Sequence, residues 1–416
     1  MERNQTMEIK RIKVANFKSF KELDIELRRF NVLVGANASG KSNFTQIFKF
    51  IRDIASFGLD NAISLQGSEY LPNIVTPSPK TLSMMLVFEP GFGFRAKKSL
   101  LVDITQSTYE FALRFGKNGG GFEIEKDELN LKVDYFRWSE RKKRTHKKNK
   151  TIGSGSIVIS NDNGLLRTAI QKPSGVEISS QDLLAPFLID KLPPKTILLE
   201  VPYIPPIKWA FRDIALYDFD PKLSKKAALI TGKSELEENG DNLSLVLKNI
   251  TEDAEKKRKF SNLIKDLLPF VDDLKTDKFV DRSLLFKLSE TYYKEGYFPA
   301  SFISDGTVNI SALLIALYFE KKDFIIIEEP ERNVHPHLIS RLMEMMKDAS
   351  KKKQIIVTTH SPEVVKHAGL ENLLLISRDK GGFSTISRPS EKKEVKIFLQ
   401  NDLGVDELYV QNLLGD

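Results

Sequence analysis

Cysteine is absent from the sequence, so disulfide bridges, thiolate metal sites and cysteine nucleophiles are all excluded. Long apolar runs are also lacking, because the most apolar segment, residues 310–319, has only about half the length of a membrane span. The first ten residues are charged and contain no apolar stretch of the kind found in signal peptides. From these absences we expect a cytoplasmic protein without a membrane partner.

Positive and negative charges balance in most of the chain. The formal net charge is +7, and residues 137–150 carry eight basic residues and one acidic residue, so the remainder sums to zero. Such a basic strip is typical of an electrostatic footprint for nucleic acid. The alternative is a solvated loop between two strands, and the sequence does not separate the two. The candidate nucleic-acid contacts are Arg141, Lys142, Lys143, Arg144, Lys147 and Lys148.

A strand, a glycine loop and a helix are predicted in direct succession near the N-terminus. Residues 30–34 form a short apolar run, and apolar side chains after Ser42 recur at the spacing of one helix face. Between them Gly35–Ser42, GANASGKS, matches the phosphate-binding pattern GxxxxGK[ST]. Backbone N–H groups of such a loop wrap phosphates, Lys41 would reach the β- and γ-phosphates, and Ser42 would bind Mg²⁺. The alternative is a tight glycine turn without a ligand.

The predicted phosphate-binding residues are Gly35, Asn37, Ser39, Gly40, Lys41, Ser42 and Asn43. A second Gly-Lys-Ser at 232–234 lacks the upstream glycine and a preceding buried strand, so we set it aside.

Two further apolar strands are predicted in the last third of the chain, over 324–327 and 354–359. They alternate with helical patterns, which favours a largely parallel sheet covered on both faces. Glu328 and Glu329 end the first strand and His360 follows the second, where a parallel-sheet nucleotide site lies. One of the two carboxylates would hold the metal and the other would deprotonate the attacking water, while His360 would contact the γ-phosphate. The alternatives are solvent-facing loop acids and a structural histidine.

A serine–glycine loop, Ser304-Asp305-Gly306-Thr307, precedes another predicted helix. A backbone-rich loop at a helix N-terminus is a second anion receptor. The alternative is a simple N-cap turn.

The middle of the sequence has a different character. Short alternating segments predict strands over 81–88, 100–104 and 157–160, and a charged helical section is clearest over 251–274. We therefore expect an α/β chain with an inserted α+β region: residues 1–58 and 300–416 would form one head, and 59–299 the insert.

The segments GANASGKS, SDGT, IIIEEPE and TTHSP, in that order, resemble those of ABC-type ATPases of the RecF/SMC/OLD group. They are most similar to stand-alone bacterial AAA family ATPases of anti-phage defence systems such as Septu and PARIS. The resemblance covers about residues 7–57 and 298–415. It implies that Gly35–Ser42 is the Walker A loop, Ser304–Thr307 the signature loop, Glu328-Glu329 the Walker B pair with its catalytic glutamate, and His360 the switch histidine.

The same resemblance implies a head-to-tail homodimer, or a higher assembly, with ATP and Mg²⁺ sandwiched between two copies. Ser304, Asp305 and Gly306 of one copy would close over the nucleotide of the other. Three features depart from the family pattern. Asp305 replaces the first glycine of the signature, Glu328 stands where aspartate is usual, and Gln66 is only a weak candidate for the Q-loop.

The function expected from this resemblance is an ATPase that regulates a separate effector, a nuclease, in DNA-linked anti-phage defence. The alternatives are an SMC/RecF-like ATPase of DNA repair or maintenance and a transporter's ATPase subunit. A fused nuclease of the OLD type is disfavoured, because only 56 residues follow His360.

Overall fold

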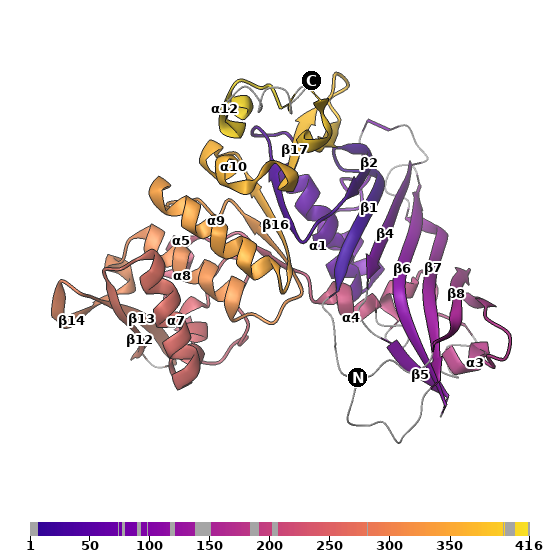
Figure 1. Ribbon diagram of the computed structural model, residues 1–416, viewed down its shortest axis with the longest axis horizontal. Helices are drawn as coiled ribbons and strands as arrows, with labels where there is room; N and C mark the ends of the chain where they lie inside the picture. Colours follow the sequence, from indigo (N-terminus) through magenta and orange to yellow (C-terminus); the bar gives the residue numbers. More distant parts are fainter. Residues whose placement is uncertain are drawn as a thin grey trace. The chain divides into compact units, whose positions relative to one another are not determined.

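The computed structural model describes residues 7–414 apart from 74, 77–79, 90–92, 98, 117–120, 138–150, 184–190, 202–206, 281, 394 and 396–403. The chain divides into two compact units, each assembled from separate stretches of sequence. Unit 1 comprises residues 1–29, 38–214 and 376–387, and unit 2 comprises residues 30–37, 215–375 and 388–416. Figure 1 shows the elements of both units.

Unit 1 is built on an antiparallel sheet of eight strands in the order β2-β1-β4-β6-β7-β8-β9, with β5 paired to β6. Its long central strands β6 and β7 run side by side (Figure 1). Burial alternates along the strands, as expected for a sheet with one face on a core. The strands are β1 (Glu8–Phe17), β2 (Phe20–Glu26), β4 (Lys80–Glu89), β5 (Gly93–Lys97), β6 (Leu100–Phe115), β7 (Phe122–Arg137), β8 (Thr151–Asp162) and β9 (Leu165–Gln171).

Helix α1 (Lys41–Phe57) is the main helix of unit 1. One of its faces is fully buried, through Phe44, Ile47, Phe48, Ile51 and Ile54. This is the apolar face that the spacing in the sequence predicts. The shorter elements of unit 1 are α2 (Leu59–Gln66), α3 (Ser180–Leu183), η4 (Leu198–Glu200), α4 (Ile207–Arg212) and β18 (Ser384–Ser387).

Unit 2 contains a parallel sheet in the order β10-β15-β16-β3-β17. The three central strands are almost wholly buried, as is typical of a parallel sheet covered on both faces. The strands are β3 (Phe30–Val34), β10 (Ala215–Tyr217), β15 (Phe324–Glu328), β16 (Gln354–Thr359) and β17 (Leu373–Arg378), and the helices are α8 (Asp305–Tyr318), α9 (Pro336–Ser350) and α10 (Pro362–Ala368). The expected α/β class with a largely parallel, helix-flanked sheet is confirmed.

A small antiparallel sheet and two helices complete most of unit 2. The sheet has the order β11-β13-β12, with β14 paired to β13. Its elements are β11 (Ala228–Leu229), β12 (Val271–Phe279), β13 (Ser283–Glu290), β14 (Tyr293–Pro299), α6 (Leu243–Thr251) and α7 (Ala254–Leu267). The remaining short elements are α5 (Pro221–Ser224), η5 (Ala300–Phe302), η6 (Leu370–Asn372), η7 (Pro389–Glu391) and α12 (Val405–Val410).

The helical section expected over 251–274 is wrong at its C-terminal end. Helix α7 ends at Leu267, and Val271 already belongs to β12. Pro269 explains the stop, because proline lacks a backbone N–H and restricts the residue before it. Among the described residues, none of the helices has both the length and the apolar character needed to cross a bilayer.

The parallel sheet gathers three loops at one edge. Val34 pairs with Thr359, and Thr358 pairs with Glu328, so β3, β16 and β15 end at nearly the same level. Gly35, His360 and Glu329 directly follow these strand ends. The carboxyl edge of a parallel sheet is where ligands bind in open α/β folds.

Candidate functional site

The glycine loop joins β3 to α1 and ends at Gly40, whose backbone has a left-handed conformation. Gly40 is the N-cap of α1, with φ 116° and ψ 12°, and no side chain caps the helix. The first turn of α1 contains no acidic residue. The positive end of the helix dipole is therefore not compensated by a carboxylate of its own first turn, as expected for an anion receptor.

Gly40 cannot carry a side chain without displacing its surroundings. A Cβ atom there would lie 2.1 Å from Ser384 Oγ. That hydroxyl is buried and donates a hydrogen bond to Ser39 O at 2.7 Å, while Arg378 Nε donates to Ala38 O at 3.1 Å. The segment containing β18 thus fixes the backbone of the loop within unit 1. The sequence did not reveal this support, because Ser384 is 345 residues from Ser39.

Ser39 carries a polar atom that suits a bound phosphate. Its side chain is 5% exposed, and its Oγ is buried without a hydrogen-bond partner. Leaving a buried hydroxyl unpaired costs about 1–3 kcal/mol. An acceptor or donor supplied by a ligand removes that cost, so the loop fits a phosphate group.

Glu329 follows the end of β15 in an unusual backbone conformation. Its φ is 44°, in the left-handed region that a residue with a Cβ seldom adopts. Its backbone N–H donates to Thr358 O at 2.9 Å, which ties it to the end of β16. The neighbouring Glu328 is the last residue of β15 and is half-buried. The chain therefore turns sharply between the two carboxylates that the sequence assigns to metal binding and to catalysis.

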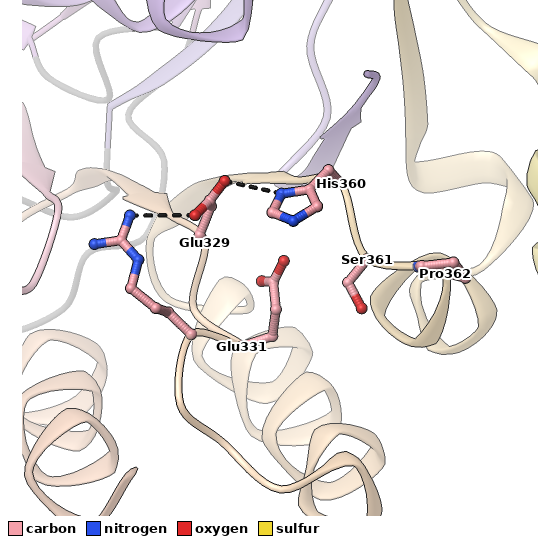
Figure 2. A pocket seen from close by; sticks show the side chains of 6 residues that line it. Glu329, Glu331, His360, Ser361 and Pro362 are labelled. Carbon is pink, nitrogen blue, oxygen red and sulfur yellow. Dashed lines mark hydrogen bonds and ion pairs between the residues drawn. The ribbon is translucent and has the colours of Figure 1, made fainter. Parts of the chain in front are cut away.

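Both carboxylate oxygens of Glu329 have partners (Figure 2). His360 Nδ1 lies 2.9 Å from Oε1, and Arg332 Nη2 donates to Oε2 at 3.2 Å. Arg332 Nη1 also donates to Asp218 Oδ1 at 2.9 Å. Burial acts to raise the pKa of Glu329, but the hydrogen bond from Arg332 and the charges of His360 and Arg332 outweigh it and lower the pKa. Glu329 is thus held as an oriented carboxylate.

A pocket of about 430 Å³ opens beside these groups and is lined by Glu329, Glu331, Arg332, His360, Ser361 and Pro362. Glu331 points into it from the same loop as Glu329 (Figure 2). Its Oε1 accepts a hydrogen bond from Thr359 Oγ1 at 2.5 Å, and its Oε2 is buried without a partner. Burial raises the pKa of Glu331. The pocket therefore pairs one carboxylate of lowered pKa with one of raised pKa.

The serine–glycine loop caps helix α8. Ser304 Oγ accepts from Thr307 N at 3.1 Å, so the N-cap role that the sequence left open is present. Asp305 forms an ion pair with Lys225, which is 19% exposed. A Cβ at Gly306 would lie 2.4 Å from Asn333 O, so this glycine permits close contact with the loop that follows Glu329.

Several predicted site residues meet in unit 2. Glu329 contacts His360, Gly35 lies at the same sheet edge, and Gly306 touches the loop after Glu329. Lys41, Ser42 and Asn43 open helix α1 in unit 1. The supporting residues Arg332, Asp218, Glu331, Ser384 and Arg378 were not predicted. The signal for the first of these was its place in the Glu-Pro-Glu-Arg stretch.

Two other predicted features do not enter the geometry described here. Gln66 is the last residue of helix α2, in unit 1. The candidate nucleic-acid contacts between Arg141 and Lys148 lie outside the described residues, which end on that side at Arg137, the last residue of β7.

Comparison with known proteins identifies the family of this chain. The model of a family described as "AAA domain, putative AbiEii toxin, Type IV TA system" matches residues 30–366. An uncharacterized protein of Methanocaldococcus jannaschii is 29% identical over 92 residues, which cover 21% of this chain and 24% of that protein. The aligned region therefore spans about a quarter of that relative's length.

Two solved structures resemble the fold. The first is an SMC head bound to the C-terminal winged-helix domain of ScpA, with TM-score 0.51, 16% identity, and coverage of 91% of this chain and 97% of that one. The second is a Pyrococcus furiosus SMC head with an extended coiled coil, bound to the C-terminal domain of ScpA. Its TM-score is 0.48 and its identity 14%, over 95% of this chain and 100% of that one. The first likeness shows the fold of an SMC-type ATPase head.

Proposed function

This chain belongs to the AAA-domain family whose model matches residues 30–366, and on that premise we propose that it binds and hydrolyses ATP with Mg²⁺. The observation that carries the proposal is the arrangement around Glu329. An oriented carboxylate, a histidine and the start of a phosphate-binding loop share one edge of a parallel sheet. Such an edge is where triphosphates bind in folds of this class.

The glycine loop supplies the proposed phosphate contacts. Backbone N–H groups of Gly35–Ser42 would wrap the phosphates, Lys41 would neutralise the β- and γ-phosphate charge, and Ser39 Oγ would gain the partner it lacks. Ser42 and Glu328 would hold Mg²⁺, which in ATPases needs few protein ligands because phosphates and water complete its shell. The bound metal would screen the negative charge that develops on the transferred phosphoryl group.

The water-activating step falls to Glu329. Its carboxylate would orient a water molecule and take the proton as the water attacks, while His360 keeps one carboxylate oxygen in place. His360 is half-exposed, so one face of its ring is accessible to a γ-phosphate. Because phosphoryl transfer depends mainly on positioning and charge, a rigidly held base is what the reaction requires.

We further propose that two copies form a head-to-tail dimer around ATP, or a higher assembly built from such dimers. Ser304, Asp305 and Gly306 of one copy would close over the nucleotide of the other. Support comes from the N-terminal turn of α8, where Ser304 is exposed and the helix N-terminus would attract an anion. Asp305 would bring a negative charge close to the phosphates, and its ion pair with Lys225 reduces the resulting repulsion.

The cellular role we propose is control of a separate effector, a nuclease, in DNA-linked anti-phage defence. DNA contact would use the basic residues between 141 and 148. The competing role is SMC/RecF-like DNA maintenance, which the likeness to an SMC head favours, and a transporter subunit is a third possibility. Neighbouring genes separate these roles: a nuclease gene supports defence, a repair operon supports maintenance, and a permease gene supports transport.

The test of ATP binding is Lys41→Ala. Loss of the lysine should reduce ATP affinity at least ~100-fold, because one charged partner of two phosphates is removed. Isothermal titration calorimetry with MgATP measures the affinity. Lys49→Ala, farther along the same helix, is the matched control and should bind ATP normally. Unchanged affinity in Lys41→Ala would refute the phosphate-loop assignment.

A further inference from the structure

Arg332 lies three residues after the proposed base, Glu329. It hydrogen-bonds both to Glu329 and to a segment that is distant in the sequence. Its Nη2 donates to Glu329 Oε2 at 3.2 Å, and its Nη1 donates to Asp218 Oδ1 at 2.9 Å and to Phe219 O at 3.3 Å. The guanidinium group therefore spans two elements. One is the loop that carries Glu329, and the other is the segment after strand β10.

Asp218 anchors the arginine from outside the catalytic loop. It directly follows β10, whose Tyr217 pairs with Ile327 of β15, two residues before Glu329. The anchor thus stands at the end of the neighbouring strand of the same sheet. A guanidinium tied to this strand end has much less freedom than one held only by its own loop.

The backbone at Arg332 is also fixed, by the helix that begins at the serine–glycine loop. Asn309 Nδ2 of α8 donates to Arg332 O at 2.7 Å. The carbonyl of Asn333 lies against Gly306 of the same helix. The side chain and the main chain of Arg332 are therefore both restrained by contacts within unit 2.

Glu329 needs such restraint for two reasons. Its backbone is in the left-handed region, with φ 44°, so its own chain does not hold it in a preferred conformation. Its carboxylate is oriented by one partner on each oxygen, His360 on Oε1 and Arg332 on Oε2. Without Arg332 the carboxylate could turn about its last side-chain torsion, which is a soft one.

We propose that Arg332 is a positioning residue for hydrolysis: anchored by Asp218, it holds the Glu329 carboxylate in the orientation that activates water. This inference rests on the proposed function, because it takes Glu329 as the base. Arginine suits the task since its planar fork donates to two carboxylates at once, whereas lysine offers a single compact charge.

The test measures ATPase kinetics of Arg332→Gln in the full-length protein. We expect kcat to fall roughly 10- to 100-fold, the cost of about 1 Å of misplacement, while KM and the affinity for MgATP change less than about twofold. Arg332→Lys should recover part of the lost kcat by restoring the charge. Asp218→Asn, which removes only the charge of the anchor, should lower kcat by roughly 3- to 10-fold.

Combining Arg332→Gln with Glu329→Gln in one protein shows whether Arg332 affects kcat through Glu329. If Arg332 acts through Glu329, adding Arg332→Gln to Glu329→Gln should slow the residual turnover no further. A full additional loss in the double variant would overturn the proposal, because the arginine would then act elsewhere. Arg341→Gln is the matched control. Arg341 of α9 pairs with Asp266 of α7 and with Glu344 of α9, and its replacement should leave kcat unchanged.

The outcomes separate this inference from the function beneath it. Full activity of Glu329→Gln would remove Glu329 as the base and with it the proposed mechanism. The other informative outcome is that Glu329→Gln loses activity while Arg332→Gln and Asp218→Asn keep the wild-type kcat. That result would support the mechanism but refute the role of Arg332. Asp218→Asn keeps the test decisive if Arg332→Gln does not fold.

Discussion

Glu329 combines two features that cost a folded chain free energy, a left-handed backbone and a partly buried charge. Left-handed residues with a Cβ cost about 1–2 kcal/mol, and they persist where the surroundings over-determine them. Here the surroundings are the hydrogen bond to Thr358 O and the contacts with Arg332 and His360. Strain at a residue held this firmly is typical of a functional site.

The first prediction concerns Glu329→Gln. The amide keeps the size of the side chain but cannot accept a proton from water, so turnover should fall at least ~100-fold. ATP binding should persist, and an ATP-bound dimer should accumulate because the nucleotide that bridges it is not cleaved. Phosphate release and light scattering measure the two effects. Glu344→Gln, an exposed residue on α9, is the control, and wild-type turnover in Glu329→Gln would move the base elsewhere.

The second prediction concerns Asp127, a buried carboxyl of β7 in unit 1. It accepts hydrogen bonds from Tyr109 Oη at 2.9 Å, Asn161 Nδ2 at 2.8 Å and Leu198 N at 2.8 Å. Burial nevertheless dominates and raises the pKa of Asp127 to about 7, from an ordinary value of 3.8. Because the pKa is raised in the folded state, the stability it contributes is present below the unfolded pKa and is lost as pH rises toward 7.

Asp127→Asn should therefore remove this part of the pH dependence. The free energy of unfolding of the wild type, relative to the variant, should fall by up to about 4 kcal/mol between pH 4 and pH 7. Urea denaturation at a series of pH values measures the difference. Asp134→Asn, which changes a half-buried carboxylate of the same strand, is the control. A constant difference across that range would show that Asp127 does not titrate there.

The sequence could predict some of these residues and not others. Glu329 and His360 stand in short motifs at strand ends, so local pattern was enough to place them, and the structure brings them within 2.9 Å. Asp218 meets Arg332 across 114 residues. That contact depends on which strand lies beside β15, and strand order is not encoded in any local pattern.

At the scale of elements, the β3–loop–α1 segment depends on Gly40. An alanine there would have to adopt φ 116° and would place its Cβ against Ser384 Oγ. We expect Gly40→Ala to weaken MgATP binding at least ~10-fold, since the loop must move to relieve the clash, and to destabilise the protein by about 1 kcal/mol or more. Calorimetric titration and thermal unfolding measure both effects.

Gly382→Ala provides the matched comparison for this third prediction. Gly382 also has a positive φ, 79°, but no atom lies within 4 Å of its added Cβ. The substitution should cost stability through backbone strain alone and leave ATP affinity unchanged. If Gly40→Ala behaves like Gly382→Ala, the close approach of Ser384 has no part in shaping the phosphate loop.

Elements with a clear pattern of apolar residues were predictable from the sequence, and elements with a weak pattern were not. The run at 354–359 coincides with β16, a wholly buried strand with three consecutive branched apolar residues at 355–357. The charged section after residue 251 gave a predicted helix that is too long, since charged residues are frequent in β12 as they are in α7. Charge alone does not distinguish an exposed helix face from an exposed strand face.

At the scale of the whole chain, the sheet class followed from alternating strand and helix patterns, and the likeness to an SMC-type ATPase head followed from four short motifs, whereas the compact units did not follow from either. Residues 30–37 belong to unit 2, and the chain from residue 38 to residue 214 belongs to unit 1. A unit boundary inside the glycine loop is invisible to composition, because the loop reads as one motif. Contacts between distant segments define the units, so sequence order alone does not show them.

The last prediction tests assembly through Ser304. This exposed residue caps α8 and belongs to the loop that we propose closes over the nucleotide of a second copy. Ser304→Arg should abolish ATP-dependent dimerisation in the Glu329→Gln background, because a long charged side chain would occupy the place of the phosphate contacts. Loss of the cap costs about 1 kcal/mol, so thermal unfolding must first show a folded monomer. Ser234→Arg, an exposed serine of unit 2, introduces the same charge elsewhere and should dimerise normally. A normal ATP-dependent dimer of Ser304→Arg by light scattering would mean that the nucleotide site is completed by other residues.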